Sequence, residues 1–190
     1  MIKAVAGSGK ETRRASLLSR VLPYALLLAV SLAVHLILRP NYGDDMNFQN
    51  ALDGTSLLSW LQLRYASWSS RLVIEAVLVL LLKLPALLWV AVDMAMLLLL
   101  YISMKRLLVT EASRKGSLIL ALLLCCYPYS HMGSAGWITT TVLYWWPLSV
   151  AAYALSGMVR SLRGESIPWY RCVLYALAAL YGCGNELAAV

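Results

Sequence analysis

The apolar residues of this chain fall into long uninterrupted blocks rather than recurring at the spacing of one helix face or one strand face. A helix needs about 20 apolar residues to cross a bilayer, because each residue adds about 1.5 Å and the hydrocarbon core is about 30 Å thick. The blocks at residues 17–38, 84–104, 117–131, 141–159 and 169–182 are predicted to be such spans. The pattern therefore predicts an all-α fold, a polytopic bundle of transmembrane helices.

Residues 72–104 form one apolar block interrupted by Glu75, Lys83, Pro85 and Asp93. Two arrangements fit it: a hairpin of two short spans, or a helix in the outer interface over 72–83 followed by one span over 84–104. Residues 72–83 are too few to cross a bilayer. The second arrangement also keeps the basic cluster after residue 104 on the cytoplasmic side. We therefore predict an outer interfacial helix and a single span.

Basic residues gather at the ends of the apolar blocks, and cytoplasmic loops of membrane proteins carry an excess of Lys and Arg. The three clusters are Lys3, Lys10, Arg13, Arg14 and Arg20; Lys105, Arg106, Arg114 and Lys115; and Arg160, Arg163 and Arg171. If all three are cytoplasmic, the N-terminus is also cytoplasmic. The predicted organisation is a basic cytoplasmic tail over 1–16 and a transmembrane helical domain over 17–190, which carries an outer loop over 39–70.

The composition is typical of a protein embedded in a lipid bilayer. Hydrophobic residues make up 61% of the chain and charged residues 13%, with a mean hydropathy of +0.72. A soluble domain carries about 25% charged residues. The net charge of +7 does not indicate a nucleic-acid partner, because no basic face interleaved with aromatic residues is present. We expect a multi-pass protein of the cell membrane whose partners are membrane lipid and other membrane proteins.

Two adjacent carboxylates, Asp44 and Asp45, lie in the predicted outer loop. Pro40 and Gly43 end the first helix and turn the chain just before them. Adjacent aspartates can supply a general base, since repulsion between like charges raises the pKa of one of them. They can equally hold a divalent cation. A third interpretation, that a loop beside a membrane is simply polar, also stays open.

Aromatic and basic residues alternate further along the same loop. Trp60, Arg64, Trp68 and Arg71 are separated by four, four and three positions, which predicts that all four lie on one side of a helix. Aromatic faces beside guanidinium groups suit a ligand that combines a sugar ring with a phosphate. An amphipathic helix resting on lipid headgroups fits the same spacing.

Further candidates are predicted on the same outer side. Tyr144 and Trp145 follow a segment rich in small residues, and they either line a sugar subsite or mark the membrane interface. Glu186 follows Gly184 and Asn185 near the end of the chain. Asp93 lies within an apolar block, where a carboxylate indicates either a site or a polar contact inside the bundle.

Together these features resemble the GT-C class of multi-spanning membrane glycosyltransferases, including bacterial GT-C-like membrane proteins. The resemblance is carried by the loop with Asp44-Asp45 after the first span, the Ser70-Arg71 step into an apolar helix, the stretch 135–147 that ends in Tyr-Trp-Trp-Pro, and the later Gly-Asn-Glu. Members of the class are generally much longer, with further spans and often a soluble C-terminal domain. This chain resembles their N-terminal portion, and the sequence fits both a small complete protein and part of a longer one.

The resemblance implies transfer of a sugar from a polyprenyl-phosphate carrier to an acceptor on the outer face. It implies that Asp44 or Asp45 acts as the base or helps to hold a metal ion, and that Arg64 or Arg71 neutralises the phosphate leaving group.

Two other functions compete with this one. A transporter or flippase component would need a polar path through the bilayer and inverted repeats, whereas the sequence shows only Asp93 firmly inside a span and no clear repeat. A non-catalytic subunit of an envelope assembly fits the small size of the chain. Binding of a polyprenyl-phosphate sugar that depends on the aspartate pair would separate the enzyme from both alternatives.

Overall fold

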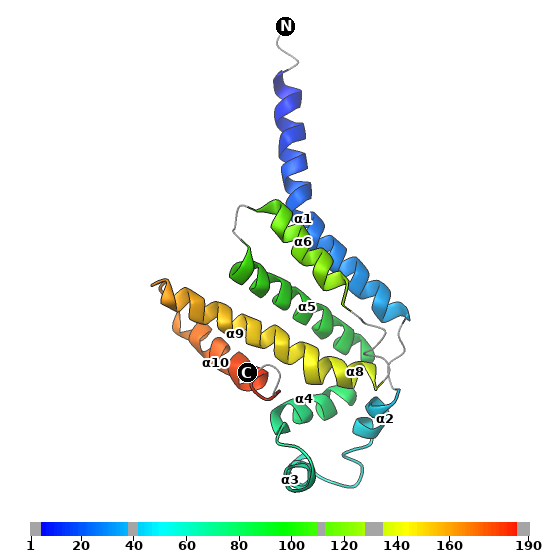
Figure 1. Cartoon of the computed structure of the whole chain (residues 1–190). Helices are drawn as coiled ribbons and strands as arrows, with labels where there is room; N and C mark the ends of the chain where they lie inside the picture. The colour runs from blue at the N-terminus through cyan, green and yellow to red at the C-terminus, as the bar shows by residue number, and fades with distance from the viewer. Residues whose placement is uncertain (1–4, 38–41, 110–112, 128–134, 186–190) are drawn as a thin grey trace.

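The computed structural model describes residues 5–37, 42–109, 113–127 and 135–185, and for residues 5–19 it describes the backbone alone. Every element in these ranges is a helix (Figure 1), which confirms the predicted all-α class. The longer elements are α1 (Val5–Ile37), α5 (Ala86–Leu108), α6 (Arg114–Cys125), α9 (Trp146–Leu162) and α10 (Trp169–Gly182). The shorter ones are α2 (Asp44–Gln49), α3 (Leu57–Ser67), α4 (Leu72–Leu82), α8 (Trp137–Thr140) and η1 (Thr141–Trp145).

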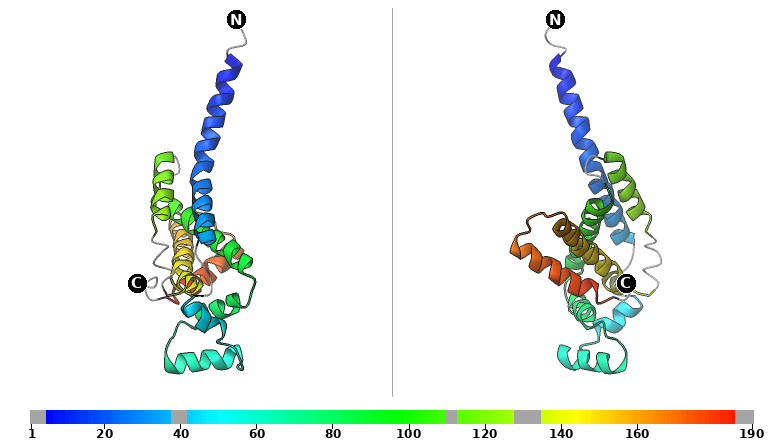
Figure 2. Two further views of the ribbon diagram at one scale, coloured as in Figure 1. Left: turned by 90° about the vertical axis from the view of Figure 1, so that its right-hand side faces the viewer. Right: turned by 60° about the vertical axis from the view of Figure 1, so that its left-hand side comes forward.

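The longer helices form a bundle. Helix α5 packs against α9, α9 against α10, and α1 against α6. Leu27, Leu97, Tyr101 and Ala121 are all buried where α1, α5 and α6 meet. The first half of α1 projects beyond the other helices, as both views in Figure 2 show.

Within the described residues, three segments are long and apolar enough to span a membrane: Arg20–Ile37, Ala86–Leu108 and the continuous helical run Trp137–Leu162. Helices α6 and α10 have 12 and 14 residues, so they are about 18 and 21 Å long, against a hydrocarbon core of about 30 Å. The structure therefore supports several spans but does not confirm the count of five. The end of the predicted span over 117–131 lies outside the described residues.

The helix is interrupted between residues 82 and 86, as the sequence predicted. Helix α4 ends at Leu82 and α5 begins at Ala86, with Pro85 at the N-cap of α5. Proline fixes φ near −65° and disfavours a helical conformation in the residue before it, so Pro85 favours a break between the two apolar helices.

The predicted single helix carrying Trp60 to Arg71 is wrong, because α3 ends at Ser67 and α4 begins at Leu72. The Ser67 hydroxyl donates to the Leu63 carbonyl at 2.6 Å, and the Ser69 hydroxyl accepts the Arg71 N–H at 3.1 Å. Serine side chains that bind nearby backbone groups offer the chain an alternative to continuing the helix.

A π-helical turn, η1, joins α8 to α9. Pro147 lacks the N–H that an α-helix would donate to the carbonyl of Leu143. The side-chain amide of Asn185 takes this place and donates to the Leu143 oxygen at 2.6 Å. Because Asn185 is buried, the segment after α10 is tied to the turn that carries Tyr144.

A polar cluster links three helices inside the bundle. Asp93 Oδ1 of α5 accepts the indole N–H of Trp146 at 2.7 Å, and its Oδ2 lies 3.2 Å from His35 Nε2 of α1. His35 Nδ1 lies 2.7 Å from the Ser31 carbonyl oxygen. Asp93 is buried, and both of its oxygens have partners. It therefore serves as a polar contact inside the bundle.

The two ends of the bundle differ in character. Helices α2, α3, α4 and α8 gather at one end, where α4 contacts α2, α3, α8 and η1 (Figure 1). The opposite end holds the last turns of α5 and α9 and the first turn of α10, which bring Arg106, Arg160, Arg163 and Arg171 together. The predicted outer residues and the predicted cytoplasmic arginines thus lie at opposite ends.

Candidate functional site

A cavity of about 700 Å³ opens among the short helices, and we call it the α2–α4 pocket. Its walls come from α2, the loop after it, α3, the loop before α4, α4, α8 and η1. The residues that line it are Asp44, Asn47, Phe48, Ala51, Trp60, Arg64, Trp68, Ser69, Ser70, Arg71, Glu75, Thr139, Leu143 and Tyr144. Six of the predicted candidate residues are among them: Asp44, Trp60, Arg64, Trp68, Arg71 and Tyr144.

Asp44 begins α2 and is exposed at the pocket. Its backbone N–H donates to the Ala135 carbonyl at 2.7 Å, so the start of α2 is held against the segment before α8. Among the described residues its carboxylate has one weak partner, the side-chain amide of Asn47 at 3.4 Å. The backbone of Asp44 is therefore held in place, while its carboxylate oxygens are accessible to a ligand.

Asp45 has a different environment, although it is the next residue. Its side chain is fully buried and does not line the pocket. Its oxygens accept the N–H of Ile138 at 3.2 Å, the N–H of Thr139 at 2.7 Å and the hydroxyl of Thr139 at 2.7 Å. A carboxylate that binds the first free N–H groups of a helix is an N-terminal cap. This geometry assigns Asp45 to holding α8 in position.

Two glycines allow the segments around Asp45 to approach so closely. Gly43 and Gly136 have φ values of +59° and +131°, which disfavour any residue with a Cβ atom. A Cβ atom on Gly43 would lie 2.8 Å from the Ala135 carbonyl oxygen, and one on Gly136 would lie 2.8 Å from Asp45 Oδ1. The small residues near 135 therefore serve the contact that positions both aspartates.

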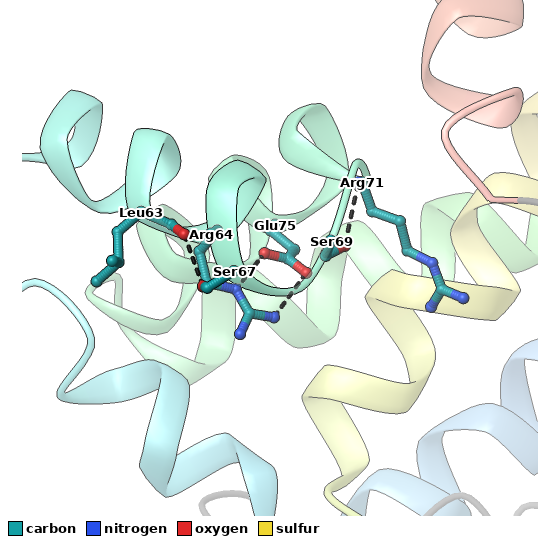
Figure 3. Close-up of polar contacts among 6 residues, drawn as sticks. All are labelled: Leu63, Arg64, Ser67, Ser69, Arg71 and Glu75. Atoms are coloured by element: carbon teal, nitrogen blue, oxygen red, sulfur yellow. Dashed lines mark hydrogen bonds and ion pairs between the residues drawn. The ribbon is translucent and has the colours of Figure 1, made fainter.

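Arg64 is held by a two-point ion pair with Glu75 of α4. Its Nε and Nη2 atoms donate to the two carboxylate oxygens, each at 2.8 Å (Figure 3). The guanidinium carbon lies 5.6 Å from the ring centroids of both Phe48 and Trp60. The hydrogen bonds to Glu75 raise the pKa of Arg64 above its usual value, against an opposing effect of burial. The pair joins α3 to α4 across the break between them.

Arg71 lies on the other side of the same wall. Its side chain points away from the Arg64–Glu75 pair (Figure 3), and its guanidinium carbon lies 5.7 Å from the ring centroid of Tyr144. A cation over an aromatic face at this distance is a favourable contact. The pocket thus presents Arg71 and Tyr144 together, and Asp44 of α2 lines the same cavity.

Of the predicted site residues that the structure describes, Trp145, like Asp45, does not line the pocket. Trp145 is buried, and its ring lies 4.3 Å from that of Tyr127, on a different side of the helix from Tyr144. Glu186 lies outside the described residues. Its neighbour Asn185 binds the Leu143 carbonyl, so the described end of the chain lies next to the pocket wall.

Four polar residues of the pocket, Glu75, Asn47, Ser69 and Thr139, were not predicted from the sequence. Glu75 carried a usable signal, since a single carboxylate in an apolar helix requires a partner and Arg64 lies 11 residues before it. Asn47 and Thr139 carried no such signal. Their place in the pocket depends on the contact between α2 and α8, which are more than 90 residues apart in sequence.

Asp44 and Asp45 do not form the two-carboxylate site for a divalent cation that the sequence left open. Asp45 uses its oxygens to accept N–H and O–H groups, so it cannot share an ion with Asp44 in this arrangement. Among the residues that the structure describes, no three His, Cys, Asp or Glu side chains gather into a metal-binding cluster. The chemistry of the pocket is therefore derived from its own side chains.

The chain matches no protein-family model, no curated protein and no solved structure. Its function is therefore inferred from its own residues and from the geometry of the α2–α4 pocket.

Proposed function

We propose that this chain is a multi-spanning membrane protein of GT-C type. In this proposal the α2–α4 pocket transfers a sugar from a polyprenyl-phosphate donor to an acceptor hydroxyl on the outer face of the membrane. The observation that supports it is the meeting of an open carboxylate, Asp44, with the guanidinium of Arg71 and the rings of Trp68 and Tyr144 in one cavity. These groups come from separate segments of the chain, so helical spacing alone does not bring them together.

Each group has a defined role in the proposed reaction. Asp44 accepts the proton of the acceptor hydroxyl as its oxygen forms a bond to the anomeric carbon of the sugar. The bond between that carbon and the phosphate oxygen breaks, and its electron pair stays on the phosphate. Arg71 stabilises the charge on the leaving polyprenyl phosphate by charge-assisted hydrogen bonds. The aromatic rings of Trp60, Trp68 and Tyr144 offer apolar faces to the sugar.

The proposed orientation follows from charge. The basic ends of α5 and α9 and the basic starts of α6 and α10 are cytoplasmic, together with the N-terminus, and the α2–α4 pocket faces the outer aqueous compartment. The donor then reaches the pocket from within the bilayer, with its phosphate at headgroup level.

Replacing Arg71 tests whether the pocket binds a lipid-linked sugar phosphate. We expect Arg71→Ala to weaken binding of a polyprenyl-phosphate-linked hexose by about 10- to 100-fold. A hydrogen bond to a charged group contributes about 1.5–3 kcal/mol, and each 1.4 kcal/mol is about a factor of ten. Retention of the radiolabelled lipid by the purified chain in nanodiscs measures this.

The matched control is Lys83→Ala. Arg71 lies just before α4, and Lys83 is a cationic residue just after it. Lys83 is exposed, pairs with Asp53 at 3.1 Å and does not line the pocket. Binding should be unchanged in this variant. Equal losses in both variants would show a general effect of charge, and no loss in Arg71→Ala would reject the proposed phosphate contact.

A further inference from the structure

A second cavity, of about 600 Å³, lies at the opposite end of the bundle, between the last turns of α5 and α9 and the first turn of α10. We call it the basic pocket. Its charged lining residues are Arg106, Arg160, Arg163, Arg171 and Glu165. Four guanidinium groups thus face one carboxylate, and the formal charge of the lining is +3.

Glu165 neutralises only one of these arginines. Its carboxylate accepts the Nε–H of Arg160 at 2.7 Å, which closes the turn after α9. Arg106 and Arg163 are exposed, and Arg171 is half-buried. Repulsion between these guanidinium groups costs free energy in the folded chain, and an anion between them would relieve it. The excess charge therefore indicates an anionic ligand.

A groove of about 250 Å³ continues from the basic pocket along α5 and α10. It is lined by Leu99, Ile102, Arg106, Tyr153, Arg171 and Tyr175, so Arg106 and Arg171 belong to both cavities. The rings of Tyr153 and Tyr175 lie 4.7 Å apart along it. Leu99 and Ile102 belong to α5, which is long and apolar enough to span a membrane. A cationic site and an apolar track thus meet at two shared arginines.

We infer that this end of the bundle binds an anionic phospholipid, with the phosphate in the basic pocket and an acyl chain along the groove. Basic pockets between membrane helices on the cytoplasmic side suit phosphate-bearing headgroups. A free phosphate shares this chemistry but would use the arginines alone and leave the groove unused. The apolar continuation past Leu99 and Ile102 favours the lipid. This inference is independent of the reaction proposed at the other end.

Native mass spectrometry of the full chain in detergent, titrated with dioleoyl phosphatidylglycerol, tests the inference. We expect saturable binding that weakens about 25-fold in Arg106→Ala/Arg171→Ala, at about fivefold for each arginine near a headgroup. Arg163→Ala, a single change of an exposed residue, should weaken binding about fivefold. If the double variant unfolds, this single variant still tests the inference, and undiminished binding in it would count against the basic pocket.

The control is Arg114→Ala/Lys115→Ala, which removes the same charge from the first turn of α6 and spares both cavities. Its lipid affinity should match that of the unmodified chain. Two competitors separate the sources of the phosphate group: inorganic phosphate and glycerophosphoglycerol, the headgroup without acyl chains. Both should displace the lipid only at concentrations at least 100-fold higher. Equal loss in the control, or displacement by inorganic phosphate at concentrations similar to those of the lipid, would overturn the inference.

Discussion

Asp44→Asn is expected to lower sugar transfer by about 100- to 10,000-fold, the range that a positioned general base contributes. The amide has nearly the same shape as the carboxylate but cannot accept the proton of the acceptor hydroxyl. Asp44 is exposed, and in the described part of the chain its side chain binds only Asn47, at 3.4 Å, so the fold should not change. Release of polyprenyl phosphate from a synthetic polyprenyl-phosphate hexose, in proteoliposomes supplied with envelope extract as the acceptor source, measures the rate.

Asp53→Asn is the matched control for this experiment. Asp53 follows Asp44 in the same polar region, but its side chain is 67% exposed, pairs with Lys83 and does not line the α2–α4 pocket. Its replacement should leave transfer unchanged. Full transfer in Asp44→Asn would remove Asp44 from the reaction. A similar loss in both variants would indicate that surface charge is responsible.

Asp45→Ala is expected to lower the free energy of unfolding by about 3 kcal/mol, whereas Asp44→Asn should leave the fold unchanged. The substitution leaves two backbone N–H groups and the Thr139 hydroxyl without their acceptor. Each buried polar group left unsatisfied costs about 1–3 kcal/mol, and loss of a helix cap costs about 0.5–2 kcal/mol. Since about 1 kcal/mol shifts the unfolding midpoint of a chain of this size by about 2–4 °C, we expect a decrease of about 6–12 °C in a thermal melt in detergent.

Asp44→Ala provides the comparison for stability, since it removes the same side chain one position earlier. Its melting temperature should fall by no more than about 2 °C, as for other exposed substitutions. Asp45→Ala should also reduce transfer, because α8 positions Thr139 in the pocket wall. Activity therefore cannot separate the two aspartates, whereas stability can. Equal melting temperatures for the two variants would contradict the assignment of Asp45 as a cap.

Neighbouring residues explain where prediction from the sequence succeeded and where it stopped. Asp44 and Asp45 were predicted as a pair, as were Tyr144 and Trp145, yet one member of each pair lines the pocket and the other is buried elsewhere. Successive side chains on an α-helix point about 100° apart. Which of two neighbours faces a cavity is therefore decided by the packing of other helices, which one sequence does not reveal.

Local signals were more reliable than those that depend on packing. Pro85 predicted the break before α5, and the apolar blocks predicted the helices. The four-, four- and three-residue spacing from Trp60 to Arg71 grouped residues that all line one pocket, but not because they share a helix. Trp60 and Arg64 lie on α3, whereas Trp68 and Arg71 lie between α3 and α4, and Arg64 pairs with Glu75 of α4. An ion pair between helices cannot be predicted from the spacing within one helix.

The most direct test of the proposed function is photo-crosslinking of the full chain in nanodiscs with a polyprenyl-phosphate hexose that carries a diazirine on its sugar. Peptide mapping should find the label on segments that line the α2–α4 pocket, near Asp44, Trp68 and Tyr144, and an excess of unlabelled polyprenyl phosphate should displace it. Label confined to the basic pocket around Arg106 and Arg171, or label in the α2–α4 pocket that the competitor leaves in place, would contradict the proposed function.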